Sequence, residues 1–295
     1  MKVAVLGANG YIARNLVYVM KRDNPDWEMY LYGIEDKSID GHSNYVQIDM
    51  TDRNAVKGID LSCDIIFMFV GKTGSTNCFD AYDTFINLNE RTLLNLLSEY
   101  RNQNSVARII YPSTRLVYKG VPFLLREDAE KEFKTIYAIQ KFACENYLKQ
   151  YNSVFNVQYT IVRICVPYGT LVPGASSYGT AEFMMNKAQK GENITLYGDG
   201  SLRRTITHIE DLCLSIIKAA VSLECANDVF NIGGEDYSLK EMALPIAGKY
   251  NVEIEYISWP NVALSVESGN TVFDSTKLDN IIGKCRYIKF SDWMK

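Results

Sequence analysis

The sequence predicts an α/β protein built on a doubly wound parallel sheet. Short β-rich runs alternate with longer helical patterns through the first half of the chain, the order that a parallel sheet covered by helices on both faces produces. The run 65–70 is apolar at every position, as a strand buried on both faces should be. Apolar side chains in 80–101 recur at helical spacing, which indicates one of the covering helices.

The individual elements follow in order along the chain. We expect helices near 11–22, 80–101 and 135–151, and strands at 2–6, 29–33, 45–48, 65–70, 108–111 and 159–164. Gly, Pro, Ser and Tyr crowd 167–179, which indicates a loop, and a further strand returns at 229–232. We therefore expect a larger domain made of 1–166 and about 205–235, and a smaller region made of about 167–204 and 236–295.

Composition and charge argue against several function classes. Of the 295 residues, 47% are hydrophobic and 22% are charged, and the net charge of -4 gives no sign of a nucleic-acid-binding surface. The longest apolar run is too short to cross a bilayer and no secretory signal precedes the first strand, so we expect no membrane association. Two histidines and seven scattered cysteines, without metal-ligand spacing, indicate free thiols, no metal site and a cytoplasmic location.

A glycine-containing turn follows the first predicted strand and opens the first predicted helix. Its sequence is Gly7-Ala8-Asn9-Gly10-Tyr11-Ile12-Ala13. Gly7 permits the tight turn, Gly10 lets a pyrophosphate approach the backbone, and the free N–H groups of the helix N-terminus favour an anion. The strand–turn–helix context predicts a dinucleotide site in which Gly7, Gly10, Tyr11 and Ile12 contact the cofactor.

Two acidic residues, Glu35 and Asp36, follow the second predicted strand. Dinucleotide folds carry a carboxylate at about this distance to bind the adenosine ribose. A carboxylate there also repels a 2′-phosphate, which favours NAD over NADP. Two alternatives stay open: the acids are solvated loop charges, or Arg14 or Lys37 binds a phosphate.

A tyrosine and a lysine, Tyr137 and Lys141, lie four residues apart on one face of a predicted helix. A free tyrosine with a pKa near ~10 is a poor base, but a nearby ammonium and a positive nicotinamide lower that pKa. The phenolate can then take a proton from a hydroxyl while hydride leaves the carbon. Ser113 and Thr114 end the preceding strand and place a hydroxyl where it can bind the reacting oxygen, unless they serve as turn residues.

Together these motifs resemble the extended short-chain dehydrogenase/reductase family, in its NAD-dependent group of sugar-nucleotide epimerases and dehydratases. The resemblance runs in order over nearly the whole chain and is weakest after about residue 240. Besides the turn at 7–13 and the tyrosine–lysine pair, it rests on Ser113-Thr114-Arg115-Leu116-Val117-Tyr118, Arg163-x-x-x-x-Tyr168-Gly169, Tyr197-Gly198-Asp199-Gly200 with Arg204, His208 and Asp211, and Phe230-Asn231-Ile232-Gly233. It implies that the larger domain is a Rossmann-like NAD-binding domain and that the smaller region binds substrate.

The resemblance also implies roles for individual residues on the cofactor side. Thr114 would be the catalytic hydroxyl and Tyr137 the base, with Lys141 as its partner and as a ligand of the nicotinamide ribose. The remaining cofactor contacts would come from the adenine side and from the end of the fourth strand, at Asp49, Met50, Val70 and Gly71.

On the substrate side, the resemblance implies a nucleotide-diphosphate sugar. Thr195 and Tyr197 would lie along its base, and Arg204 would clamp the diphosphate through its paired donors, unless it forms a surface salt bridge. Val166 would also contact the substrate, but it stands where relatives carry an asparagine, which removes one polar contact. Arg115 and Leu116 stand where dehydratases of this group carry an Asp-Glu pair, so that elimination machinery is missing.

We therefore expect an isomerase, a 4-epimerase that works through a 4-keto sugar intermediate and keeps its NAD. A 4-ketosugar reductase that consumes NAD(P)H is the alternative enzyme, and a non-catalytic dinucleotide-binding scaffold is the alternative of another class. The resemblance and the apolar content of the helices near 80–101 and 135–151 predict a homodimer.

Overall fold

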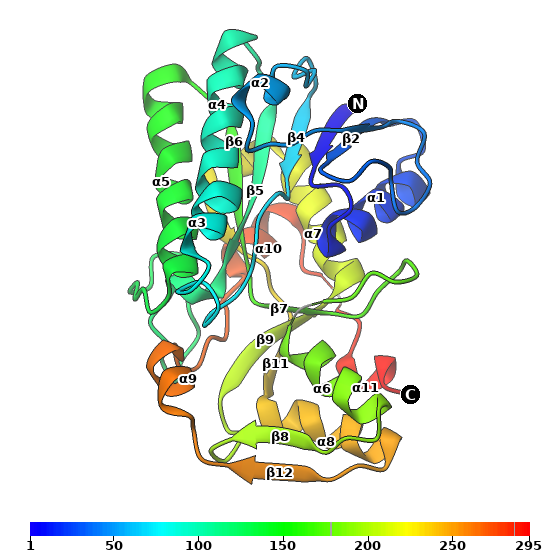
Figure 1. Ribbon diagram of the computed structural model, residues 1–295, viewed down its shortest axis with the longest axis vertical. Helices are drawn as coiled ribbons and strands as arrows, with labels where there is room; N and C mark the ends of the chain where they lie inside the picture. Colours follow the sequence, from blue (N-terminus) through cyan, green and yellow to red (C-terminus); the bar gives the residue numbers. More distant parts are fainter. Residues whose placement is uncertain (178, 286) are drawn as a thin grey trace.

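The computed structural model describes residues 1–177, 179–285 and 287–295. Within these residues a seven-stranded sheet has the order β10-β6-β5-β4-β1-β2-β3, and all of its neighbours pair in parallel (Figure 1). Its strands are β1 (Lys2–Leu6), β2 (Glu28–Gly33), β3 (Tyr45–Gln47), β4 (Ile65–Met68), β5 (Arg108–Thr114), β6 (Tyr159–Ile164) and β10 (Asp228–Asn231). This order runs outward in both directions from β1 and β4, so the predicted doubly wound sheet is confirmed.

Helices cover both faces of this sheet. Alternate residues of the buried strands enter two separate cores, one under α1 and α7 and the other under α2, α4 and α5. In β4, for example, Phe67 belongs to the first core and Ile66 and Met68 to the second, as the pleat of a strand requires. These helices are α1 (Tyr11–Asp23), α2 (Arg53–Val56), α4 (Thr92–Asn102), α5 (Ile136–Phe155) and α7 (Ile209–Val221), with α10 (Thr276–Ile282) beside α7.

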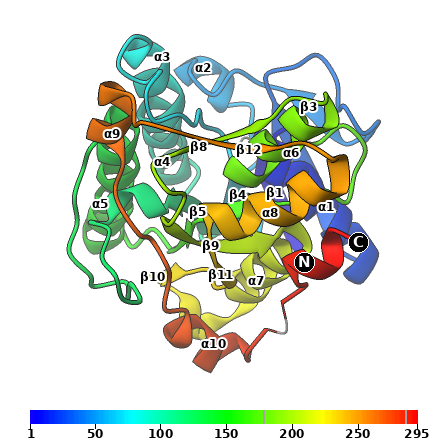
Figure 2. The same ribbon diagram turned by 90° about the horizontal axis from the view of Figure 1, so that it is seen from below.

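The rest of the chain forms a smaller layer below the carboxyl ends of the parallel strands (Figures 1 and 2). As far as the described residues show, β7 (Val166–Tyr168), β9 (Arg203–His208) and β11 (Glu235–Ser238) make one sheet, and β8 (Ile194–Tyr197) pairs with β12 (Ile254–Ile257). Their helices are α6 (Thr180–Gln189), α8 (Leu239–Tyr250), α9 (Asn261–Val266) and α11 (Phe290–Trp293). A third core, which includes Tyr168, Met184 and Phe290, holds this layer together.

Three local differences from the predicted elements bear on the site. Strand β5 continues to Thr114, so both Ser113 and Thr114 lie on the strand itself. The region 80–101 is divided into α3 (Tyr82–Phe85), a π-helical stretch (Ile86–Arg91) and α4. The stretch 167–179 begins as strand β7 rather than as loop, and its Tyr178 lies outside the described residues.

The π-helical stretch contains Asn89, whose backbone and side chain both make contacts outside it. Its backbone carbonyl accepts a hydrogen bond from the Cys144 thiol at 3.2 Å. The Asn89 amide meanwhile pairs with both backbone groups of Lys72, at 2.8 Å and 3.1 Å. One polar residue thereby fixes the loop after β4 against α5.

Candidate active site

The turn at Gly7 has the geometry of a dinucleotide cradle. Gly7 has a φ of +80°, and a Cβ added there would lie 2.8 Å from the backbone nitrogen of Val70. Gly10 precedes α1, and no side chain of the described residues caps that helix, so its first N–H groups face outward. A pyrophosphate supplies the acceptors that such a helix end needs, and the residues present therefore fit a bound dinucleotide.

The loop after β2 carries Glu35 close to this turn. The Asn9 amide donates to Glu35 Oε2 at 3.1 Å and to the Lys37 carbonyl at 3.0 Å, so Asn9 holds the loop beside the cradle. Asp36 is exposed in the same loop. Arg14 is buried and forms a bidentate ion pair with Asp40, at 2.8 Å and 2.6 Å. Because its guanidinium is already paired, Arg14 does not offer a 2′-phosphate a free positive charge.

The other expected cofactor residues border the same edge of the sheet. Asp49 accepts hydrogen bonds from the backbone and hydroxyl of Thr51 at 2.8 Å and 2.7 Å, while Met50 is buried beneath that turn. A Cβ at Gly71 would lie 3.9 Å from Lys141 Nζ, so the end of β4 approaches the lysine of α5. The cradle, β4 and Lys141 therefore form one continuous strip.

Thr114 and Tyr137 lie side by side at the far end of this strip, and Lys141 follows Tyr137 by one helical turn. Thr135 caps α5 by accepting the N–H of Ala138 at 3.0 Å, which places Tyr137 in the first helical turn and Lys141 one turn later. Burial raises the pKa of Tyr137, while the Thr114 side chain and the charge of Arg115 lower it. Burial lowers the pKa of Lys141 to about 8, and its ammonium donates to the Pro112 carbonyl at 2.8 Å. The remaining ammonium protons are available to a ribose.

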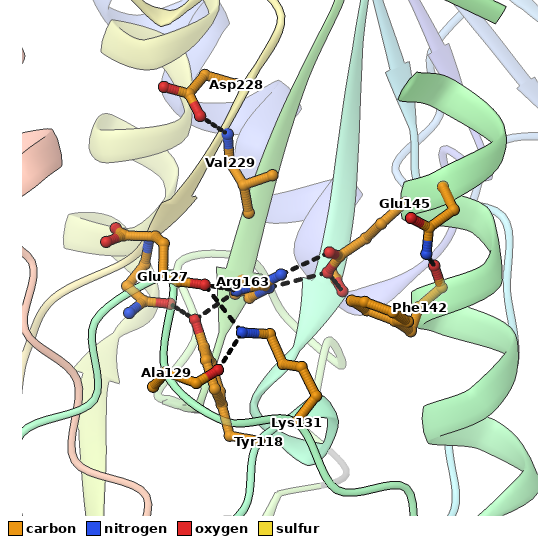
Figure 3. A network of polar contacts seen from close by, with 12 residues as sticks. Tyr118, Glu127, Ala129, Lys131, Phe142, Glu145, Arg163, Asp228 and Val229 are labelled. Carbon is orange, nitrogen blue, oxygen red and sulfur yellow. Dashed lines mark hydrogen bonds and ion pairs between the residues drawn. The ribbon is translucent and has the colours of Figure 1, made fainter. Parts of the chain in front are cut away.

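The two neighbouring hydroxyls of β5 have different partners. Ser113 donates to Glu145 Oε1 at 2.5 Å and so belongs to a buried network behind the site. In this network Arg163 grips both oxygens of Glu145, at 2.9 Å and 2.6 Å, and donates to the Tyr118 hydroxyl at 2.6 Å (Figure 3). Because Glu145 follows Lys141 by one turn of α5, the network fixes α5 against β5 and β6.

A cavity of about 550 Å³ lies between the smaller layer and the segment that joins β5 to α5, which contributes Lys119, Gly120, Glu132 and Lys134 to its lining. Tyr197, which is 38% exposed, packs on Trp259 with the ring centres 5.1 Å apart, and both line this cavity. Thr195 accepts a hydrogen bond from Lys187 at 3.0 Å. Val166 is buried in the core of the smaller layer.

Arg204 lies behind one wall of this cavity. Its guanidinium is 2% exposed and donates to Glu267 Oε1 at 2.6 Å and to the Gly269 carbonyl at 2.5 Å. Burial lowers its pKa to about 10, and the nearby charge of Arg115 acts in the same direction. Arg204 thus forms a salt bridge, as the alternative expects, but the pair is buried beside the cavity rather than at the surface, and the diphosphate clamp stays a prediction.

A sequence model of the NAD dependent epimerase/dehydratase family matches residues 3–233. The chain belongs to this family. It is 22% identical over 249 residues to a putative UDP-glucose 4-epimerase of Methanocaldococcus jannaschii, covering 81% of this chain and 79% of that protein. It is 24% identical to CDP-paratose 2-epimerase of Salmonella typhi, covering 96% and 94%.

Solved structures show the same fold. UDP-glucose 4-epimerase of Thermus thermophilus, in complex with NAD, superposes with a TM-score of 0.87 at 20% identity, over 100% of this chain and 96% of that one. Pal from Bacillus thuringiensis superposes with a TM-score of 0.88 at 20% identity, over 100% and 96%. The predicted family is thus confirmed, and the two relatives compared by sequence are named as enzymes of sugar nucleotides.

Some residues of this epimerase/dehydratase site have no signal in the sequence. Phe85 and Cys78 pack around Tyr137, with the Phe85 ring edge-on at 6.4 Å between centres. Glu267 and Trp259 come from the segment after β12, where no motif marks them. No group of metal-binding side chains occurs among the residues that the structure describes. Within the same residues, no helix is both long enough and apolar enough to span a membrane.

Proposed function

We propose that this protein is an NAD-dependent 4-epimerase of a nucleotide-diphosphate sugar. The observation that carries the proposal is that Tyr137 is buried beside Thr114, one helical turn before Lys141, whose ammonium lies near the end of β4. A scaffold protein has no use for a buried hydroxyl, phenol and ammonium assembled at this place.

The smaller layer supports a nucleotide-sugar substrate. The exposed ring of Tyr197 and the neighbouring Trp259 offer a nucleotide base a stacking surface inside the cavity. Arg204 has the planar donors that suit a diphosphate, which would replace the carboxylate of Glu267. UDP-sugars occupy two similar proteins, the Thermotoga maritima UDP-glucose 4-epimerase with UDP-glucose and a Bacillus cereus epimerase with UDP-glucuronic acid.

The proposed reaction follows from the residues around the reacting carbon. Bound NAD, held by the Gly7–Gly10 turn and Lys141, would supply the hydride acceptor and donor that inversion at C4 requires. Tyr137 takes the proton of O4 and gives it back, so no net oxidation occurs. Thr114 hydrogen-bonds O4, and Lys141 holds the ribose and stabilises the phenolate. Arg115 and Leu116 supply no acid–base pair for the loss of water, which favours epimerisation over dehydration.

We also propose NAD rather than NADP, a homodimer and a cytoplasmic location. Glu35 beside the cradle repels a 2′-phosphate, and Arg14 is already paired with Asp40. Tyr82, Ile86 and Ile139 expose between 40% and 53% of their surface on adjoining helical segments, which a second subunit would cover. Light scattering at micromolar concentration should give the mass of a dimer, and a monomer would contradict that part of the proposal.

Turnover of Tyr137→Phe tests the mechanism. The variant should fold and retain NAD, because only a hydroxyl is lost, while its rate on an active UDP-sugar should fall by roughly 10²–10⁴-fold. Thr114→Val should reduce the rate less. Sugar deuterated at C4 should keep its label in the product, whereas stoichiometric consumption of added NAD(P)H would indicate the reductase instead. A near-normal rate of Tyr137→Phe would overturn the mechanism.

Gly10→Val tests the cofactor site separately. Gly10 has an ordinary φ of -73°, so valine can adopt this backbone, although its Cβ would lie 3.2 Å from the Gly7 carbonyl and the turn must shift slightly; circular dichroism of the variant checks that it is folded. The branched side chain would occupy the place of the pyrophosphate, and mass spectrometry of the released cofactor should find no NAD. Unchanged NAD content would remove the basis for this site.

A further inference from the structure

Arg115 is the residue next to the proposed catalytic hydroxyl. It begins a short 3₁₀ turn, Arg115–Val117, that Thr114 caps by accepting the N–H of Leu116 at 3.3 Å. Its guanidinium donates to Ser268 Oγ at 3.1 Å and, more weakly, to Thr271 Oγ1 at 3.4 Å. Arg115 therefore starts at the reacting end of the site and reaches toward the segment that also binds Arg204.

This guanidinium is half-buried and pairs with hydroxyls alone. Arg163 and Arg204 each have a carboxylate partner, whereas no ion pair of the described residues includes Arg115. A cation that is partly removed from water without a counter-charge is costly, because two hydroxyls replace its hydration poorly. The nearby carboxylate of Glu267 pairs with Arg204 and not with Arg115, so an anionic ligand would gain from the unpaired charge of Arg115.

We propose that Arg115 binds an anionic substituent of the sugar beside the reacting carbon, so that the preferred substrate is a nucleotide-linked uronic acid. This inference rests on the proposed function, because it assumes that the sugar lies at Thr114 and Tyr137. In such a sugar the C6 carboxylate is attached to C5, next to C4, and a planar guanidinium can grip it through two parallel hydrogen bonds.

The position of Arg115 favours the sugar over the diphosphate. Arg204 is on β9, behind the cavity that Tyr197 and Trp259 line, and so serves the nucleotide end. Arg115 begins the 3₁₀ turn that the Thr114 side chain caps, so its side chain starts at the sugar end and extends toward Ser268. The charge of Arg115 lowers the pKa of both Tyr137 and Arg204, as expected for a group between the two. A carboxylate bound there would also neutralise that charge, which is otherwise uncompensated beside the base.

Binding measurements with three probes test this assignment on the NAD-loaded protein. UDP-glucuronate, UDP-glucose and UDP share the nucleotide and diphosphate, and only the first carries a sugar carboxylate. Calorimetry should show UDP-glucuronate binding roughly 10–100-fold more tightly than UDP-glucose, the range of a charge-assisted hydrogen-bonded pair. Arg115→Gln should abolish this preference and leave the affinity for UDP unchanged, which also shows that the variant is folded. Arg115→Lys should retain part of the preference, because lysine keeps the positive charge but lacks the two parallel N–H donors of a guanidinium.

Arg126→Gln is the matched control. Arg126 is an exposed arginine outside the site, and its substitution removes the same charge from the chain without touching the pocket. It should leave all three affinities unchanged. If Arg126→Gln reduced the preference as much as Arg115→Gln, the effect would be one of net charge and the assignment would be wrong.

Other outcomes separate this inference from the proposed function. Equal loss of UDP and UDP-glucuronate affinity in Arg115→Gln would place Arg115 on the diphosphate and overturn the inference, as would equal affinity of the native protein for both sugars. Turnover is measured independently: epimerisation of UDP-glucose alone would keep the function and refute the inference. An Arg115-dependent preference for the uronate without any epimerisation would keep the inference and refute the proposed function. Failure of both sugars to bind at millimolar concentration would contradict both proposals.

Discussion

Two arginines of this molecule, Arg163 and Arg204, are equally buried and yet differ in what surrounds them. Each is 2% exposed. Arg163 meets both oxygens of Glu145 and the Tyr118 hydroxyl, and its pKa is raised because this pairing more than offsets the effect of burial. Arg204 meets one oxygen of Glu267 and two backbone carbonyls, and burial lowers its pKa to about 10.

The partners explain the difference. Glu145 is 0% exposed and is held on α5, whereas Glu267 is 19% exposed and follows the short helix α9 at the wall of the cavity. A carboxylate that has no route to water is a permanent partner, but one at a cavity can be exchanged for a ligand. If Arg204 binds the diphosphate as proposed, burial alone does not separate a structural arginine from a binding one, whereas the completeness of its pairing does.

The largest expected effect is on stability, from Arg163→Met. The substitution leaves Glu145 charged, buried and without its guanidinium, which should cost about 3–5 kcal/mol of the free energy of unfolding. Urea denaturation measures the loss, and Arg163→Met combined with Glu145→Leu should recover a large part of it. A loss below about 1 kcal/mol for the single variant would show that the Arg163–Glu145 pair contributes no more to stability than an ion pair at the surface.

A smaller effect is expected at a third buried cation, Lys141. Its folded pKa of about 8 lies below the unfolded value of 10.5, so the unfolded chain binds more protons between these two values. The destabilisation that buried Lys141 causes is thus complete below pH 8 and disappears as the pH rises toward 10.5. Relative to native protein, Lys141→Met should gain at most about 3 kcal/mol at pH 7, and this gain should vanish near pH 10. A gain in stability that does not depend on pH would show that burial does not lower the pKa of Lys141.

Arg204→Met should affect binding more than stability. Glu267 can turn toward the cavity once its partner is gone, so the unfolding free energy should fall less than in Arg163→Met. The affinity for UDP should drop by roughly 10–100-fold, as expected for a lost charge-assisted contact with the diphosphate, and NAD content should not change. Equal UDP affinity of variant and native protein would show that Arg204 does not bind the diphosphate and has a structural role.

The smallest expected effect belongs to Glu267→Gln. The diphosphate would no longer compete with a carboxylate for Arg204, so UDP should bind more tightly. A partly exposed ion pair contributes about 0.2–1 kcal/mol, which corresponds to a gain of roughly 2–5-fold in affinity. Weaker UDP binding would show instead that Glu267 helps to position Arg204 for the ligand.

Local patterns predicted the parts of this site that depend on local structure. The turn at Gly7 and the one-turn spacing of Tyr137 and Lys141 could be read because a strand end and a helix fix these positions within a few residues. The partner of Ser113 could not be read, since it lies 32 residues away on a different element. Likewise, Glu267 meets Arg204 across 63 residues, a contact that only the packing of the smaller layer creates.

The same distinction applies to the fold. Apolar runs such as Ile66–Met68 predicted the strands because a strand that is buried on both faces has an apolar residue at every position. The π-helical stretch at 86–91 has no comparable pattern in the sequence, and the partners of its Asn89, Lys72 and Cys144, lie far from it in the chain. Domain boundaries at 166 and 205 stay predictions.

The close contact of Gly120 with the segment that carries Glu267 limits how this protein can evolve. Gly120 donates its N–H to the Ser268 carbonyl at 2.7 Å, and a Cβ there would lie 2.0 Å from that oxygen. Any larger residue at position 120 would push away the segment whose Ser268 and Gly269 contact Arg115 and Arg204. If both arginines bind substrate as proposed, a single codon change at position 120 would therefore disturb the two contacts at once, although Arg204 lies more than eighty residues further along the chain. Variation at this glycine should track changes of substrate among close homologues.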